Sequence, residues 1–386
     1  MYYVLVMTPE VEAAIIAAGV GILTFLGAVY GSRKTSQDTK DALNEQLAQQ
    51  RKQLAETLQA QSDQLDRTLA EQRTRTLNER FATAASQLGE DKPAAVRLAG
   101  VYAMAGLADD WQESRQTCID VLCGFLRMPY EPALGSEVPL ADWLVFSAGR
   151  EVRHTVIRVI TAHLRGGAEP SWQGLKFDFR GVVFDGADFA GATFSGGMAD
   201  FTGASFSSGT TDFTDATFSG GMVDFTSATF SGGRVDFTGA TFSGGKVYFG
   251  ATFSGGAVKF AYATFCGADV GFRDSIVSGG TIDFEGATVT KSSAFSGKVW
   301  FGHSTFSGGR ISFARITLSG GALGFRGAAF SGTVLDFTGA KFAGGLADFS
   351  SVTEWSHPPR FDFDLAHSPF EVKLPAEVQG ETRKAR

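Results

Sequence analysis

Cysteine and proline are scarce in this chain of 386 residues, which has three cysteines and ten prolines. An odd number of cysteines, with Cys118 and Cys123 close together on a predicted helix, disfavours a disulfide framework and favours a reducing compartment. We interpret these two residues and Cys266 as small core residues without a catalytic role. The low proline content also weighs against a disordered linker.

Positive charge is not in excess either, because the formal net charge is −7. This balance argues against a nucleic-acid-binding surface, so we expect no direct contact with nucleic acid. Catalytic, cofactor and metal-binding motifs are missing as well. His154 and His163 are nine residues apart on a predicted helix, which does not place them on one face for metal binding. We interpret them as surface or capping residues, and we predict no catalytic, cofactor-binding or metal-binding residues.

An uncharged apolar run occurs near the N-terminus, at residues 13–30. At about 1.5 Å per residue it is just long enough to span a hydrocarbon core of roughly 30 Å. Two glutamates precede the run, whereas Arg33 and Lys34 follow it, which places the N-terminus outside and the body in the cytoplasm. A signal peptide would require basic residues before the apolar run, but the residues that precede it include no lysine or arginine. We therefore predict a single-pass membrane anchor at residues 1–34; a buried soluble helix is the alternative.

Glycine and proline are absent from Thr35 to Gln87, which predicts a long helix. Leucine pairs recur along it every 11 residues: Leu43 and Leu47, Leu54 and Leu58, Leu65 and Leu69. This period gives an almost straight apolar stripe. The stripe is narrow, so pairing with a second copy would bury the leucines. We predict a polar coiled-coil helix at residues 35–80 and homo-oligomerisation through it; a lone spacer helix is the alternative.

Helical patterns continue through residues 81–168, which we assign to a small all-α domain. Pro93 stands where a proline is tolerated at a helix start, and Ser114 is an expected N-cap. The expected elements are helices over 94–108, 115–127 and 151–164 and a proline-containing loop over 128–139.

Phenylalanine is abundant, with 35 residues against seven tyrosines and five tryptophans. Phe179, Phe184 and Phe189 are spaced by five, and from Phe194 the spacing alternates between seven and five. The residue two positions before each phenylalanine is small or β-branched, and the residue between is polar. Because alternate residues of an extended segment share a side, each segment points a phenylalanine inward and a polar residue outward. Such a short fixed period indicates a solenoid.

The run FDFRGVVFDGADFAGATF at residues 177–194 resembles the tandem A(D/N)(L/F)XX units of the pentapeptide-repeat family. The resemblance implies a right-handed quadrilateral β-helix, which we assign to residues 173–352. The 12-residue unit that follows is similar to a family variant with two extra residues at every second corner. The whole arrangement, an α + β multidomain chain, is similar to membrane-anchored actinobacterial pentapeptide-repeat proteins of unassigned role.

Four sides of five, seven, five and seven residues make a coil of 24 residues, so about seven coils are expected. Residues 24 apart should then stack, as Phe201 with Phe225 and Phe213 with Phe237. The spacing from Phe249 to Phe253 is one residue short, and the pattern slips around Val289 to Phe301, where we expect a bulge or an irregular corner.

The C-terminal segment, residues 353–386, includes three aromatic residues that we expect to cap the open end of the core: Trp355, Phe361 and Phe363. We expect the last ten or so residues to be disordered.

Outward aspartates suggest one function. Asp200 with Asp224 and Asp212 with Asp236 should form ladders on opposite faces, and some pentapeptide-repeat proteins mimic DNA, bind the type II topoisomerase gyrase and protect it from quinolones. The acidic character ends halfway along the rod, however. We therefore interpret the aspartates as solvated residues that pair with backbone or with neighbouring threonines.

An enzyme is a third hypothesis, but His303 is the one histidine in the rod and has no accompanying acid and nucleophile. We predict a non-enzymatic scaffold that is tethered to the lipid bilayer and presents its β-helix to a protein partner in the cytoplasm. The alternative is a DNA-mimicking binder of gyrase.

Overall fold

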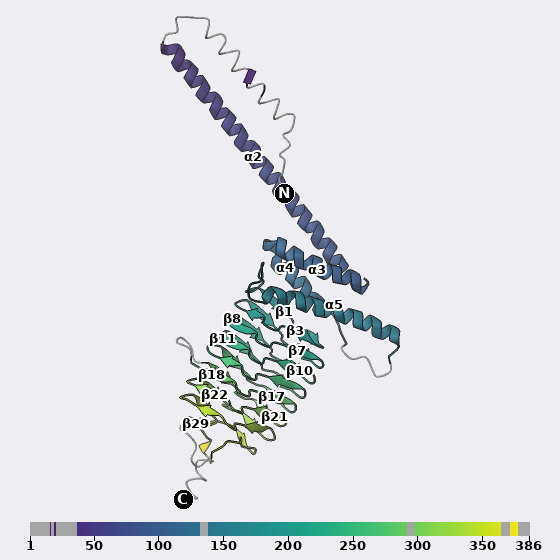
Figure 1. The fold of residues 1–386 in the computed structure, drawn as a ribbon, viewed down its shortest axis with the longest axis vertical. Coiled ribbons are helices and arrows are strands. Elements are labelled where there is room, and N and C mark those ends of the chain that lie inside the picture. The colour runs from purple at the N-terminus through teal and green to yellow at the C-terminus, as the bar shows by residue number, and fades with distance from the viewer. Residues whose placement is uncertain are drawn as a thin grey trace. The chain divides into compact units, whose positions relative to one another are not determined.

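The computed structural model describes Ile16, Gly19, Val20 and residues 37–131, 138–291, 297–363 and 371–376. The chain divides into two compact units, residues 1–76 and 77–386 (Figure 1). The predicted anchor lies almost wholly outside the described residues, as does the predicted disordered tail. Among the helices that the structure describes, none has the length and apolar character to cross a membrane.

A single helix of 51 residues, α2 (Gln37–Gln87), confirms the predicted long helix and continues beyond its expected end at residue 80. In the first unit its surface is polar, with an i,i+4 ion pair between Lys52 and Glu56 and a hydrogen bond between Gln59 and Asp63. Such pairs each stabilise a helix by about 0.2–0.5 kcal/mol. The leucine stripe stays uncovered: Leu54, Leu58, Leu65 and Leu69 are 53–54% exposed.

The second unit begins with a helical domain, formed by the end of α2 with α3 (Ala94–Asp110), the short 3-10 helix η1 (Gln112–Ser114), α4 (Arg115–Leu126) and α5 (Leu140–Leu164). Leu77 and Ala84 of α2 are buried in it, and Arg80 pairs with Asp110 at 2.8 Å. Ser114 precedes α4 as predicted, but its side chain makes no capping hydrogen bond, so the N-cap prediction is wrong in its chemistry.

Helix α5 starts 11 residues before its predicted start at residue 151. Its first turns carry apolar side chains that remain exposed, including Leu140, Leu144 and Val145. The later turns bury Val152, Val156 and their neighbours. The prediction used only the helical period of that buried stripe, so it missed the exposed first turns.

From residue 176 the chain forms a β-solenoid of about eight turns with parallel pairing between turns (Figure 1). Its first face is formed by β1 (Lys176–Asp178), β5 (Met198–Asp200), β15 (Asp269–Gly271), β19 (Lys298–Trp300), β23 (Ala322–Gly324), β27 (Leu346–Asp348) and β29 (Val372–Lys373). The second face is formed by β2 (Val183–Phe184), β6 (Ser205–Phe206), β9 (Thr229–Phe230), β12 (Thr252–Phe253), β16 (Ile276–Val277), β20 (Thr305–Phe306), β24 (Ala329–Phe330) and β28 (Glu354–Trp355).

The third face is formed by β3 (Ala187–Asp188), β7 (Thr210–Asp212), β10 (Arg234–Asp236), β13 (Ala257–Lys259), β17 (Thr281–Asp283), β21 (Arg310–Ser312) and β25 (Val334–Asp336). The fourth contains β4 (Thr193–Phe194), β14 (Thr264–Phe265), β18 (Thr288–Thr290), β22 (Thr317–Ser319) and β26 (Lys341–Phe342). Two longer strands, β8 (Thr217–Asp224) and β11 (Thr241–Tyr248), continue around the corner from the fourth face to the first. The four predicted sides are thus confirmed.

The register between coils follows the phenylalanine spacing. Thr217 pairs with Thr241, which confirms the coil of 24 residues. Thr229 pairs with Thr252, so this coil is one residue shorter, as the short spacing before Phe253 predicts. Asp269 pairs with Lys298, so five residues are inserted in that coil, and its residues 292–296 lie outside the described part. The predicted slip is therefore an insertion between β18 and β19.

Phenylalanine rings fill the interior. Phe201 and Phe225 stack with ring centroids 4.6 Å apart, and Phe213 and Phe237 with centroids 4.7 Å apart, as predicted. All four rings are fully buried. Burying one such side chain contributes about 1.5–3 kcal/mol, so the column of rings dominates the stability of the solenoid.

The C-terminal end of the core is covered by the aromatic residues predicted for it. Phe361 stacks on Phe337 at 5.0 Å, and Trp355 packs edge-on against Phe349 at 5.4 Å. Strands β28 and β29 extend the rod beyond residue 352, so it has about eight turns where period arithmetic predicted seven.

Glycine is required where corners stack directly on one another. Gly221 has a φ of +68°, and a Cβ atom there would lie 2.4 Å from the carbonyl oxygen of Gly197 in the preceding coil. No L-residue side chain fits between such backbones, which explains the recurring Gly-Gly pairs.

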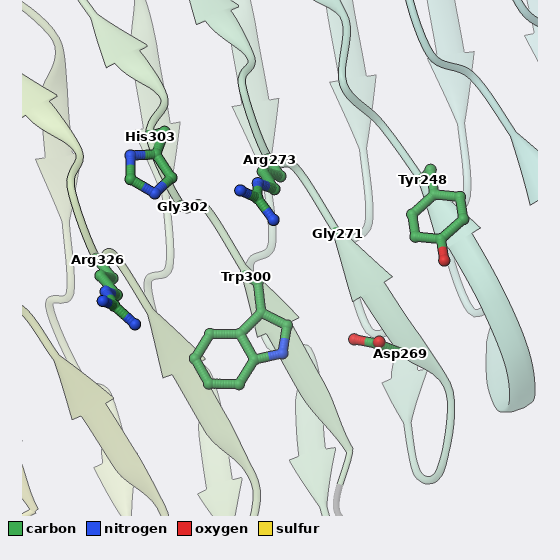
Figure 2. Close-up of a pocket in the computed structure, with 8 residues that line it drawn as sticks. All are labelled: Tyr248, Asp269, Gly271, Arg273, Trp300, Gly302, His303 and Arg326. Atoms are coloured by element: carbon green, nitrogen blue, oxygen red, sulfur yellow. The ribbon is translucent and has the colours of Figure 1, made fainter.

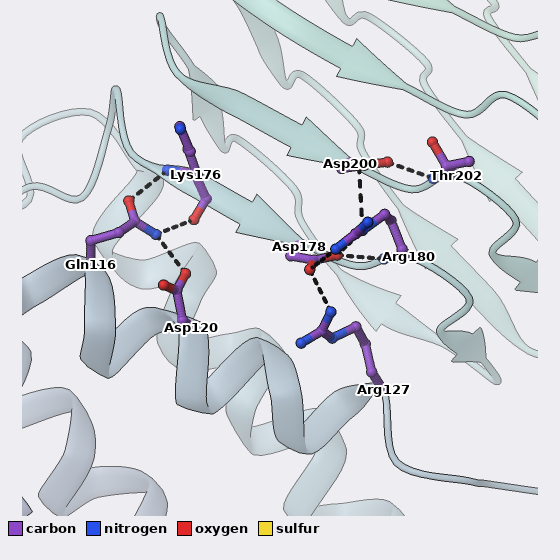
Figure 3. A network of polar contacts seen from close by, with 8 residues as sticks. All are labelled: Gln116, Asp120, Arg127, Lys176, Asp178, Arg180, Asp200 and Thr202. Atoms are coloured by element: carbon purple, nitrogen blue, oxygen red, sulfur yellow. Dashed lines mark hydrogen bonds and ion pairs between the residues drawn. The ribbon is translucent and has the colours of Figure 1, made fainter.

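The helical domain covers the N-terminal end of the solenoid. Thr161 of α5 donates a hydrogen bond to the carbonyl oxygen of Asp188 at 2.6 Å, and Arg153 donates to that of Val183 at 3.1 Å. From α4, Gln116 makes two hydrogen bonds to the backbone of Lys176 (Figure 3). These contacts satisfy strand-edge groups that would otherwise invite pairing with another chain.

Candidate functional site

The predicted aspartate ladders exist. Asp200 lies in register with Asp224 on the first face, and Asp212 lies in register with Asp236 on the third. Each carboxylate accepts a hydrogen bond from the backbone N–H two residues later, as in Thr202 N to Asp200 at 2.9 Å (Figure 3). This contact builds the following turn. The predicted pairing of these aspartates with backbone is therefore confirmed, but Asp236 is buried and not solvated as predicted.

Arginines offset much of the remaining negative charge. Asp178 accepts hydrogen bonds from Arg127 at 2.5 Å and from Arg180 at 2.8 Å, and Arg180 also approaches Asp200 at 3.6 Å (Figure 3). The Arg180 hydrogen bond, opposed in part by burial, lowers the pKa of Asp178. Arg234 pairs with Asp236 in the same way. The ladders are consequently less negative than their sequence suggests.

His154 and His163 are not the surface or capping residues that we predicted. Their side chains are only 22% and 19% exposed. His154 Nε2 lies 3.0 Å from Asp185 Oδ1 in the first coil, and the His163 ring stacks on Trp172 at 4.0 Å. His154 thus has Asp185 as a partner distant in sequence, and His163 has Asp109, whose Oδ2 lies 3.1 Å from His163 Nε2; a helical spacing cannot reveal such partners.

Asp185 is the centre of a buried polar cluster, with 4% of its side chain exposed. Tyr130 donates a hydrogen bond to it at 2.5 Å, and Arg150 Nε donates another at 2.7 Å. Burial alone would raise the pKa of Asp185, but the hydrogen bonds from His154, Tyr130 and Arg150 outweigh it and hold the pKa at about 2. The cluster joins α5 and the preceding loop to the first coil, so its role is structural.

Cys118 and Cys123 are buried core residues, as predicted, whereas Cys266 is only half-buried. Burial raises the pKa of Cys118 to about 11 and that of Cys123 to about 12, so neither thiol ionises readily. Within the described ranges, no group of three or more histidine, cysteine, aspartate or glutamate residues could hold a metal ion.

A surface hollow of about 480 Å³ lies over the first face, where the acidic ladder stops (Figure 2). The outward residues of three successive coils line it, namely Tyr248, Gly271 and Trp300, and Gly324 of the next coil continues the same column. Corner residues complete its lining: Arg273, Gly302, His303 and Arg326. Its volume is in the range of pockets that bind small molecules or a few side chains.

Aromatic residues and glycines alternate in the hollow for a steric reason. A Cβ atom at Gly324 would lie 2.1 Å from the Trp300 ring, so only glycine leaves room for the indole. At Gly271 a Cβ atom would touch the Tyr248 ring at 3.6 Å. The Trp300 side chain retains 36% exposure, so part of the indole is open to solvent.

The hollow carries net positive charge. Arg326 has no ion pair or side-chain hydrogen bond to any residue that the structure describes, and Arg273 has only an exposed pair with Asp274 at 3.5 Å. Exposed pairs of this kind contribute about 0–1 kcal/mol. The one carboxylate in the lining, Asp269, lies in register between Lys246 and Lys298 on the adjacent coils.

The hollow was not predicted from the sequence, although a signal existed. Four residues stand immediately before an inward phenylalanine, and this position marks them as outward-facing: Tyr248, Gly271, Trp300 and Gly324. Their alignment with Arg273 and Arg326 depends on the coil lengths, and the five-residue insertion obscures that alignment in the sequence.

The family model of pentapeptide repeats matches residues 176–207, in eight copies. Neither the curated proteins nor the solved structures include a significant match to the chain. The solenoid is therefore a pentapeptide-repeat β-solenoid, and its later coils extend the pattern beyond the matched residues. Proteins of this type are generally non-enzymatic and serve structure or interaction.

Proposed function

We propose that this protein is a non-enzymatic interaction scaffold whose solenoid binds a protein partner through the hollow over its first face. One observation carries the proposal. Along this face the outward residues change from Asp200 and Asp224 to Tyr248 and Trp300 over the coils that form the hollow. Aromatic and arginine side chains are enriched at protein interfaces, whereas aspartate is depleted.

The rigidity of the solenoid supports this role. Stacked rings hold each coil, α5 covers one end and Trp355 and Phe361 pack at the other. A surface on such a frame is ordered before the partner arrives, so binding loses little conformational entropy.

The apolar run at residues 13–30 and the helix α2 add two further parts to the proposal. The run is uncharged and long enough for a membrane anchor, which would place the solenoid at the cytoplasmic side of a bilayer. The exposed leucines of α2 would be buried if two copies paired along it. The scaffold would then present two hollows, and a partner with two binding segments would gain avidity.

Photo-crosslinking in the native cell tests the scaffold. A photoreactive phenylalanine analogue in place of Tyr248 should crosslink a partner protein. The matched control is Tyr262, an exposed tyrosine (62%) on the rod outside the hollow lining. A crosslinked product specific to position 248 supports the proposal; identical products at both positions, or none at either, contradict it.

Mimicry of DNA is the second candidate function. The in-register aspartates favour it, but their bonds to backbone and arginine, and the aromatic hollow beyond them, weigh against an extended negative surface. The purified protein at micromolar concentration would inhibit gyrase supercoiling if it acted as a DNA mimic, and absence of inhibition would remove this candidate.

A further inference from the structure

The hollow also indicates which kind of protein segment would bind. We infer that it recognises a short acidic segment of the partner, with a carboxylate between Arg273 and Arg326 and an apolar or aromatic neighbour against Trp300. This inference rests on the proposed function, since it assumes that the hollow is the binding surface.

The two arginines stand on coils that are two steps apart. Asp274 N donates to Gly302 O, and His303 N donates to Arg326 O, so Gly302 occupies the intervening coil. Stacked strands are about 4.8 Å apart, which separates the two arginine backbones by roughly 10 Å. Both side chains are exposed and lack strong partners among the described residues. They can therefore turn toward a carboxylate between them, which the guanidinium group binds in bidentate fashion.

Glycine leaves the space for that carboxylate. The nearest atom to a Cβ built at Gly302 is the carbonyl oxygen of Arg326, 3.5 Å away, so no side chain fills the floor between the arginines. Figure 2 shows Trp300 between Tyr248 and Arg326, with Arg273 and His303 beside it. A carboxylate over Gly302 would thus have an indole surface next to it for the following side chain.

Charge complementarity limits the ligand to an anion of short length. Lys298 Nζ lies 5.6 Å from the Trp300 ring centroid and adds positive charge beside the arginines. The same column of the first face returns to aspartate on both sides of the hollow, at Asp224 and Asp348. A long polyanion such as a nucleic acid would run past these carboxylates, and the whole chain has a net charge of −7. A short acidic peptide avoids both repulsions.

The test uses the full-length protein in detergent micelles and a dye-labelled octapeptide in which glutamate alternates with tyrosine. Fluorescence anisotropy measures its Kd. We expect R273Q/R326Q to raise the Kd by about 100-fold, because each charge-assisted contact is equivalent to about tenfold. W300A should also weaken binding by about tenfold or more.

The control variant K259Q/K341Q removes the same charge from the third and fourth faces, and we expect it to bind like the wild type. Thermal melting of each variant shows whether the solenoid is intact. A peptide with glutamine in place of glutamate should bind at least about tenfold more weakly, because it lacks the carboxylates.

Several outcomes would overturn the inference. These are no binding of the glutamate peptide at millimolar protein, equal binding of the glutamine peptide, equal effects of the control variant, or tighter binding of a single-stranded oligonucleotide. Each of these outcomes is compatible with the proposed scaffold function if the analogue at position 248 crosslinks a partner in cells. Failure of that crosslink, in contrast, would contradict the scaffold directly.

Discussion

Phe225 lies in a column of rings, with its centroid 4.6 Å from that of Phe201 and 4.7 Å from that of Phe249. Its side chain is fully buried, whereas the following residue, Thr226, is exposed at a corner. Two adjacent residues therefore differ completely in environment, and the period of the repeat determines which of them matters for stability.

Phe225→Ala should lower the free energy of unfolding by about 3–5 kcal/mol, because it opens a cavity in a packed column. Thr226→Ala should lower it by under about 1 kcal/mol, because only the exposed side chain changes. Chemical denaturation followed by circular dichroism measures both. Small and equal effects would contradict the inward phenylalanine column.

Asp185 makes the free energy of unfolding depend on pH. Its folded pKa of about 2 is below the usual value, because the hydrogen bonds from His154, Tyr130 and Arg150 outweigh burial. A depressed folded pKa gives stability that is present above the unfolded pKa of about 3.9 and is lost as the pH falls through the folded pKa.

The free energy of unfolding of the wild type should therefore fall, relative to Asp185→Asn, by about 2 kcal/mol between about pH 6 and pH 2. Parallel denaturant titrations of the two proteins at each pH measure this difference. A constant difference across that window would show that the Asp185 carboxylate is not stabilised as its contacts indicate.

The elements differ in how they obtain stability. Strands of two or three residues pair with the coils on either side, whereas the first-unit part of α2 depends on its own backbone and local polar pairs. A mostly polar helix with a narrow apolar stripe gains most of its stability from packing of that stripe. The exposed leucines are therefore where a second copy would stabilise α2.

Replacement of Leu54, Leu58, Leu65 and Leu69 by glutamine should convert an oligomer to a monomer. Sedimentation of residues 35–386 measures the mass of both proteins, and the wild type should sediment as a dimer or larger species that dissociates on dilution. Threonine substitutions for Gln50, Gln61 and Gln72 on the same helix serve as a control. A wild type that is monomeric at high concentration would exclude pairing through α2.

At the scale of the whole molecule, we propose two separate roles: the apolar run at residues 13–30 attaches the chain to a membrane, and the solenoid binds a partner. The first coil of the solenoid is covered by α5, which hydrogen-bonds to it, and at the other end Trp355 and Phe361 pack on the phenylalanine core. The covered N-terminal end is thereby protected from pairing with the strands of another rod.

The full-length protein should therefore float with membranes, and deletion of residues 13–30 should release it. A C-terminal epitope should be digested by protease in inverted vesicles and be protected in right-side-out vesicles, because the basic residues after the run favour a cytoplasmic body. Deletion of residues 2–8 is the matched control and should leave the protein in the membrane. Digestion in right-side-out vesicles alone would reverse the predicted topology.

The sequence by itself determined the solenoid, its inward phenylalanines and its irregular coils, whereas its four sides were implied by the resemblance to pentapeptide repeats. These features follow from local spacing: a residue's position in the repeat sets the side to which it points, and a missing or extra residue shifts the register directly. The long helix α2 was predicted for the same reason, because absence of glycine and proline is a local property.

Only the tertiary structure decided which outward residues meet. Asp185 meets Tyr130 and His154 because α5 and the loop before it pack on the first coil. Arg273 and Arg326 flank Gly302 because backbone hydrogen bonds stack three coils there, and the five-residue insertion shifts which residues align. Contacts between distant segments depend on packing and coil length together, and neither leaves a local period in the sequence.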